Sequence, residues 1–209
     1  SRAIPALPPQ GVIEKIRFRP LSGTWRSIKK ARQTPSIWMA ILAISWFWFL
    51  GASYLTQFPN FTKTVLGGDN TVVTALLVAF SVGVGIGSML CERLSGDRVE
   101  LGIVPIGSIG LTLFGISLYF SSPAQLPTEL LSLPQFLASA FGWWVLIDLT
   151  LIGVFGGLFI VPLYALLQQR AEPEQRARVI AANNIFNALF MVVSAIAGIV
   201  FLSLLDLAI

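Results

Sequence analysis

The residues that could carry out chemistry in this sequence are few. Its 209 residues include no histidine and a single cysteine, Cys91. Ser-His-Asp catalysis, histidine metal sites and intrachain disulfides are therefore excluded within the chain. The glycine run at 83–87 lacks the strand and the spacing of a dinucleotide fingerprint. We predict that the segment is not an enzyme, that it holds no metal or cofactor, and that it binds no nucleic acid.

Asp148 is the one acid well inside a long apolar run. A carboxylate in lipid costs several kcal/mol, so it must face a cavity or a partner. It follows Gly142, the start of that run, by about 9 Å of helix, which places it near the rim of a bilayer rather than at its centre. Two interpretations are open. Asp148 contacts a cationic headgroup amine or takes up a proton, or it is hydrogen-bonded to a neighbouring helix.

Two amides are spaced to share a helical face. Asn183 and Asn187 are four residues apart, next to Asn184, in the last apolar run of the chain. They are candidates to line a substrate pathway, and Ser45 and Gln57 in the first run are candidates of the same kind. Polar residues in membrane helices also bind helices together, at about 0.6–2 kcal/mol each, and that alternative stays open.

The elements that position these residues are membrane helices. The composition is 55% hydrophobic and 11% charged, which is too apolar for a soluble domain of this size. We predict an all-α integral membrane protein, because the apolar runs are about 20 residues or longer, the length that crosses a bilayer core. The five predicted spans are residues 36–56, 71–91, 101–120, 142–167 and 179–205. Pro162 is expected to kink the fourth span.

Glycines at helical spacing predict where these helices approach closely. Gly83 and Gly87 are four residues apart in the second span, and Gly153 and Gly157 repeat that spacing in the fourth. Such pairs let two helices in lipid come into close contact.

The positive charges predict the orientation. Residues 1–35 hold eight of the fourteen cationic residues, and thirteen of the fourteen fall on one side of the predicted membrane, with Lys63 alone on the other. By the positive-inside rule, residues 1–35 are a cytoplasmic segment. A short amphipathic helix is expected at 24–32, and another short helix at 132–141. The basic segment is either a solvated linker or a strip that adheres to anionic headgroups.

The chain begins without a methionine or a signal-peptide pattern, so we expect an internal piece of a longer protein. Five spans would leave the C-terminus outside the cell. A sixth helix would complete one half of a twelve-span transporter built from two repeats.

The charged segment between the second and third spans then identifies a family. The sequence GSMLCERLSGDR at 87–98 resembles the loop signature of the major facilitator superfamily, with Glu in place of the usual Asp and one extra residue before the second glycine. Further stretches, at 46–61, 85–115 and 162–195, resemble the bacterial lysophospholipid transporters of that superfamily, including those fused to acyltransferase and acyl-carrier-protein synthetase domains. The residues that fill the signature are Gly87, Glu92, Arg93, Gly96, Asp97 and Arg98.

The resemblance implies a domain organisation. Residues 1–35 would be the basic cytoplasmic linker at the centre of the transporter, and residues 36–209 its C-terminal half. The five spans would be helices seven to eleven of twelve, and the last helix would be missing. Glu92 and Arg98 would pair or cap a helix end, and so hold the cytoplasmic side closed in one state of alternating access; an ordinary charged turn is the alternative.

The resemblance also implies a function. The chain would move a lysophospholipid, such as lysophosphatidylethanolamine, across the bacterial inner membrane for reacylation. Its partners would be the lipid bilayer, the substrate, the N-terminal half of the same transporter and a fused or associated acyltransferase. Two alternatives remain: a drug or small-solute exporter of the same superfamily, and the membrane anchor of a fused acyltransferase.

Overall fold

The computed structural model describes residues 20–96, 98–121, 123 and 129–201. These residues form helices and no β-strand. Five of the helices are long and apolar enough to cross a membrane, which confirms the prediction of an all-α membrane protein with five spans. The helices are α1 (Pro20–Ala31), α2 (Pro35–Thr64), α3 (Asn70–Ser95), α4 (Ile103–Phe120), α5 (Leu133–Leu137), α6 (Ala140–Arg170) and α7 (Arg176–Ile199).

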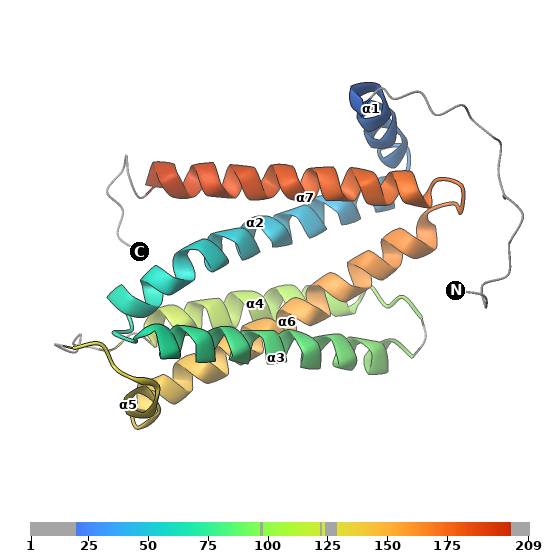
Figure 1. The fold of residues 1–209 in the computed structure, drawn as a ribbon. Coiled ribbons are helices and arrows are strands. Elements are labelled where there is room, and N and C mark those ends of the chain that lie inside the picture. The colour runs from blue at the N-terminus through green and yellow to red at the C-terminus, as the bar shows by residue number, and fades with distance from the viewer. Residues whose placement is uncertain (1–19, 97, 122, 124–128, 202–209) are drawn as a thin grey trace, which may run out of the picture.

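Helix α6 is the centre of the bundle. It contacts α2, α3, α4, α5 and α7, whereas α7 packs mainly along α2 (Figure 1). The long helices therefore form two groups, one of α3, α4 and α6 and one of α2 and α7, joined by the contact between α2 and α6. Pro162 lies inside α6, which is helical on both sides of it.

Glycines allow α3 to lie directly against α6. Gly83 and Gly87 of α3 are buried, and they face Gly153 and Gly157 of α6. A Cβ added at Gly87 would lie 2.0 Å from the carbonyl oxygen of Val154, far inside van der Waals contact. The predicted close approach of these two helices is therefore confirmed. Gly87 consequently belongs to the interface between α3 and α6 rather than to the charged turn.

Glycines on α4 allow two phenylalanines of α6 to approach closely. A Cβ at Gly110 would lie 2.1 Å from the ring of Phe155, and one at Gly107 would lie 2.7 Å from the backbone nitrogen of Phe159. The Phe155 ring therefore fills the space at Gly110, and the α6 backbone at Phe159 lies directly against Gly107. Helix α4 is held along α6 by this fit of shapes.

The described cationic residues other than Lys63 gather at one end of the bundle, here called the basic end. It contains α1, the beginnings of α2 and α7, and the turn between α3 and α4 (Figure 1). Helix α1 packs on α7, and its last residue, Ala31, is buried. The Arg32 guanidinium lies 4.7 Å from the ring centre of Trp38, close enough for a cation–π interaction. Residues 1–19 of the basic segment lie outside the described residues.

At the opposite end, a short connection joins α2 to α3 and pairs with the segment before α5. The Asp69 amide donates to the Leu131 carbonyl at 2.9 Å, and the Leu131 amide donates to Gly67 at 2.7 Å. The Asp69 carboxylate caps α3 by accepting bonds from the amides of Thr71 and Val72. The hydrogen bond from the Thr71 hydroxyl lowers the pKa of Asp69 below its ordinary value.

Several helices extend beyond the predicted spans. Helix α2 continues to Thr64 because Phe58 and Thr62 are buried, and because the Thr62 hydroxyl bonds back to the Phe58 carbonyl. Helix α3 likewise continues to Ser95, so Glu92 and Arg93 are helical rather than part of a loop. The two short helices form as α1 and α5, with bounds that differ from the predicted ones by a few residues.

Candidate functional site

Four polar side chains from three helices meet inside the bundle and form what we call the polar cluster: Ser45, Trp48, Tyr164 and Asn187. The Ser45 hydroxyl donates to Asn187 Oδ1 at 2.9 Å. Asn187 Nδ2 donates to the Tyr164 hydroxyl at 3.4 Å, and Trp48 Nε1 donates to the same oxygen at 3.1 Å. The cluster thereby joins α2, α6 and α7, and it brings together two of the residues predicted from the sequence, Ser45 and Asn187.

The polar cluster lies in the half of the bundle that is nearer the basic end. Ser45 and Asn187 follow the first residues of α2 and α7, Pro35 and Arg176, by ten and eleven positions. Both helices begin at the basic end, so each side chain is about 15 Å along its helix. Tyr164 lies six residues before Arg170, the end of α6, and is therefore about 9 Å along that helix from the basic end. Ser45 is fully buried and Asn187 nearly so. Neutral hydrogen-bonding groups at this depth suit a polar ligand or bind helices together.

Asn183 lies one helical turn closer to the basic end than Asn187. It is 1% exposed, and its Nδ2 makes a long contact of 3.5 Å with Asn184 Oδ1. Its own Oδ1 has no hydrogen-bond partner among the described residues. An unpaired buried acceptor costs about 1–3 kcal/mol, so this position favours a partner that the described residues do not supply.

Further polar residues continue along the contact between α2 and α7 toward the opposite end. The hydroxyls of Ser53 and Ser194 lie 2.7 Å apart. The Gln57 amide nitrogen lies 3.8 Å from where a Cβ at Gly198 would stand. Gln57 is thus separate from the polar cluster, although it lies on the same helix contact.

Asp148 is in a different part of the bundle. Its side chain is 2% exposed, and its Oδ2 accepts hydrogen bonds from the hydroxyls of Ser117 at 3.0 Å and Ser121 at 2.9 Å. Ser117 lies in the last turn of α4 and Ser121 directly follows this helix, at the end of α4 that is farthest from the basic end. The carboxylate therefore bridges α6 and α4, as in the second of the two interpretations open from the sequence.

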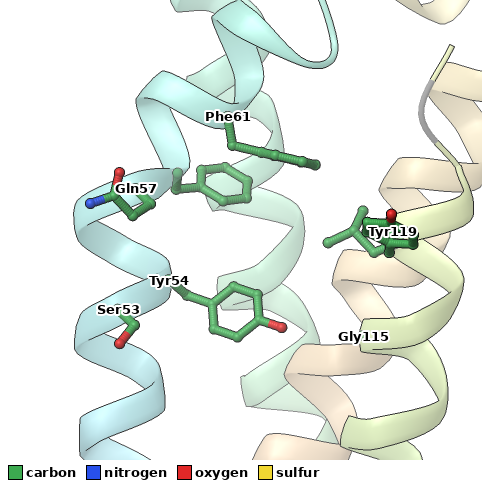
Figure 2. A pocket seen from close by; sticks show the side chains of 8 residues that line it. Ser53, Tyr54, Gln57, Phe61, Gly115 and Tyr119 are labelled. Carbon is green, nitrogen blue, oxygen red and sulfur yellow. The ribbon is translucent and has the colours of Figure 1, made fainter. Parts of the chain in front are cut away.

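An aromatic groove lies between α2 and α4 near the end opposite the basic one. It has a volume of about 290 Å³. Figure 2 shows Tyr54 and Phe61 extending from α2 toward α4, with Tyr119 on the far side of the gap. Its walls are mostly apolar, and Ser53 and Gln57 are at its α2 side.

The charged turn at the basic end has a simple local structure. Gly96 takes up a left-handed conformation with φ of 51° and ends α3. Glu92, Arg93 and Arg98 are all exposed. Glu92 and Arg98, both within the described residues, do not form an ion pair with each other in this conformation. Asp97 lies outside the described residues.

Sequence reasoning missed Tyr164 and Trp48, and also the serines that bind Asp148. A tyrosine or tryptophan in a membrane span is common and carries no spacing signal. Only the packing of α6 against α2 and α7 shows that the Tyr164 hydroxyl oxygen accepts hydrogen bonds from Trp48 and Asn187. Within the described residues, no group of three or more histidine, cysteine or acidic side chains could hold a metal ion.

Comparison with known proteins gives the following matches. The model of the Major Facilitator Superfamily matches residues 3–195. The lysophospholipid transporter LplT of Enterobacter sp. (strain 638) is 28% identical over 171 residues, covering 81% of this chain and 38% of that protein. LplT of Klebsiella pneumoniae subsp. pneumoniae is 28% identical over 174 residues, with the same coverage. LplT of Cronobacter sakazakii is 31% identical over 134 residues, covering 64% of this chain and 29% of that protein. The chain thus spans well under half the length of these curated relatives. No solved structure matches it significantly.

Proposed function

We propose, because the chain belongs to the major facilitator superfamily, that it is part of a transporter that moves a lysophospholipid, such as lysophosphatidylethanolamine, across the bacterial inner membrane. The observation that carries the proposal is the set of relatives, each named a lysophospholipid transporter, over as much as 81% of the chain. The five spanning helices are consistent with this function, and we assign no enzymatic activity to the segment.

The polar cluster could bind the polar headgroup of such a lipid. A lysophospholipid carries a polar headgroup and one acyl chain, so its path needs hydrogen-bonding groups within an otherwise apolar bundle. Ser45, Asn187 and Tyr164 provide such groups where three helices meet, about 9 to 15 Å from the basic end of their helices. We therefore assign the headgroup pathway to this cluster and to Asn183, whose Oδ1 has no partner among the described residues.

The other predicted residues take supporting roles in this proposal. Asp148 holds α4 against α6, because Ser117 and Ser121 saturate one of its oxygens and exclude solvent from it. Gln57 extends the polar contact between α2 and α7. The charged turn with Glu92 and Arg98 would form its ion pairs in another state of alternating access, with residues of the N-terminal half. An acyltransferase, fused or associated, would consume the delivered lysophospholipid.

The test is a leaflet-to-leaflet transport assay on the full-length protein. Liposomes carry fluorescent lysophosphatidylethanolamine in one leaflet, and a membrane-impermeant quencher reports its movement to the other. We expect movement with the parent protein, a loss of at least about tenfold with Asn187→Ala, and no loss per folded molecule with Asp148→Asn. Thr112→Ala, on an exposed face of α4, is the matched control. Movement no faster than in protein-free liposomes would refute the proposal and favour an exporter of small solutes or a membrane anchor.

A further inference from the structure

The hydroxyl of Tyr164 is used only as an acceptor. It accepts one hydrogen bond from Trp48 Nε1 and another from Asn187 Nδ2. A tyrosine hydroxyl also has one proton to donate. Among the residues that the structure describes, none accepts a hydrogen bond from it. Within the described part of the chain, the polar cluster therefore ends in an O–H group whose proton has no acceptor.

The hydrogen bonds of the cluster form a chain that leads to the Tyr164 hydroxyl. Ser45 donates to Asn187 Oδ1, and Asn187 in turn donates to Tyr164, which also receives the Trp48 bond. Chains of hydrogen bonds polarise one another in a low-dielectric interior, so the two N–H bonds that this oxygen accepts strengthen the hydrogen bond that the hydroxyl can itself donate. The Tyr164 hydroxyl is for this reason a stronger donor than an isolated tyrosine.

A strong donor suits a strong acceptor, and the most effective acceptors are anionic oxygens. No carboxylate competes for this position. Asp148 is the one buried charged residue of the described part, and it precedes Tyr164 on α6 by about 24 Å of helix. The Tyr164 side chain is half-buried, unlike the fully enclosed Asn183, so a ligand can reach it.

We propose that the Tyr164 hydroxyl donates a hydrogen bond to a phosphate oxygen of the transported lipid, and that Trp48 and Asn187 position it for that contact. This inference rests on the proposed function, since the ligand is the headgroup of the lysophospholipid. It goes further by naming the atom of the headgroup that is recognised. Tyr164 is then a residue that distinguishes a phosphate-containing lipid from a neutral one.

The test measures binding to the full-length protein in detergent micelles. Two single-chain lipids are compared: lysophosphatidylethanolamine, which has a phosphate, and a monoacylglycerol of the same chain length, which has none. Tyr164→Phe removes the hydroxyl and keeps the ring. We expect it to weaken lysophosphatidylethanolamine binding about 10- to 100-fold, because hydrogen bonds to charged groups are strong, and to leave monoacylglycerol binding unchanged. Tyr119→Phe, at the other end of the bundle, is the matched control and should change neither.

The outcomes separate the two proposals. If the parent protein binds neither lipid above the control level, the proposed function fails. If the parent binds lysophosphatidylethanolamine and Tyr164→Phe binds it equally well, or loses both lipids by the same factor, the phosphate contact is refuted while the function stands. If inorganic phosphate competes as well as the lipid, the ligand is a free phosphate and the lipid contact is refuted.

A second variant keeps the test valid if Tyr164→Phe does not fold. Trp48→Phe removes one of the two bonds into the Tyr164 oxygen and leaves its proton in place. It should weaken lysophosphatidylethanolamine binding by a few-fold and spare monoacylglycerol, and an equal effect on both lipids would refute the inference.

Discussion

Replacing Gly87 by alanine should separate α3 from α6. The added Cβ would lie 2.0 Å from the Val154 carbonyl oxygen, whereas ordinary contacts begin at 3.4 Å, so the two backbones must move apart by about 1.4 Å at this point. Overpacking of this kind costs about 1–3 kcal/mol. The better helix propensity of alanine offsets about 1 kcal/mol of it. We expect a net loss of up to about 2 kcal/mol, or a fall in Tm of up to about 8 °C.

Gly85 provides a matched control on the same helix. A Cβ added there has no neighbour within 4 Å, so Gly85→Ala should leave the Tm unchanged or raise it slightly. The assay is thermal unfolding of the purified full-length protein in detergent, followed by loss of the monodisperse peak in size-exclusion chromatography. The double variant Gly83→Ala/Gly87→Ala should lose less than the sum of the single losses, because the first substitution already separates the helices. Equal Tm values for Gly85→Ala and Gly87→Ala would refute the reasoning.

Three further predictions concern polar contacts. Asp148→Ala should lower the free energy of unfolding by about 1–3 kcal/mol. Asp148→Asn should lower it by less, because the amide oxygen still accepts a hydrogen bond from Ser117 or Ser121. Chemical unfolding of both variants measures the losses, and a larger loss for Asp148→Asn would contradict this account. A double-mutant cycle of Ser53→Ala and Ser194→Ala should give a coupling of about 0.6 kcal/mol, and a coupling of zero would mean that the 2.7 Å contact does not stabilise the fold. The Thr71 hydroxyl lowers the pKa of Asp69 in the folded state. The stability that the ionised Asp69 contributes to the fold is therefore complete above the ordinary pKa of 3.8, and it is lost as the pH falls through the lower folded pKa. Asp69→Asn keeps the cap, so thermal unfolding at a series of pH values should show that this variant loses less stability in acid than the parent protein. Identical pH profiles for the two proteins would contradict this account.

The sequence was sufficient to predict the helices, because each span is a long apolar run and needs no knowledge of its neighbours. The glycine pairs were predictable for a similar reason, since their spacing of four places them on one face. The bounds were less predictable. Residues 57–64 look like a connection because they contain Pro59 and Lys63, yet Phe58 and Thr62 are buried and extend the helix.

The contacts of the candidate site could not be predicted from the sequence. Ser45 and Asn187 were singled out as polar residues in apolar runs, but their hydrogen bond joins positions 142 residues apart. Tyr164 has no unusual neighbours in the sequence, and its role depends on two side chains that reach it from α2 and α7. Asp148 was recognised at once as an exceptional residue, whereas its serine partners are ordinary members of another span.

The central place of α6 has a consequence for synthesis of the protein. Helices α2, α3 and α4 leave the ribosome before α6 exists, yet α3 and α4 make their main contacts with it. The glycine faces of α3 and α4 therefore stay against lipid until about residue 170 has been made and inserted. A nascent chain that stalls before α6 is complete would carry α3 and α4 without their main neighbour, and quality-control proteases of the membrane would meet it in that state.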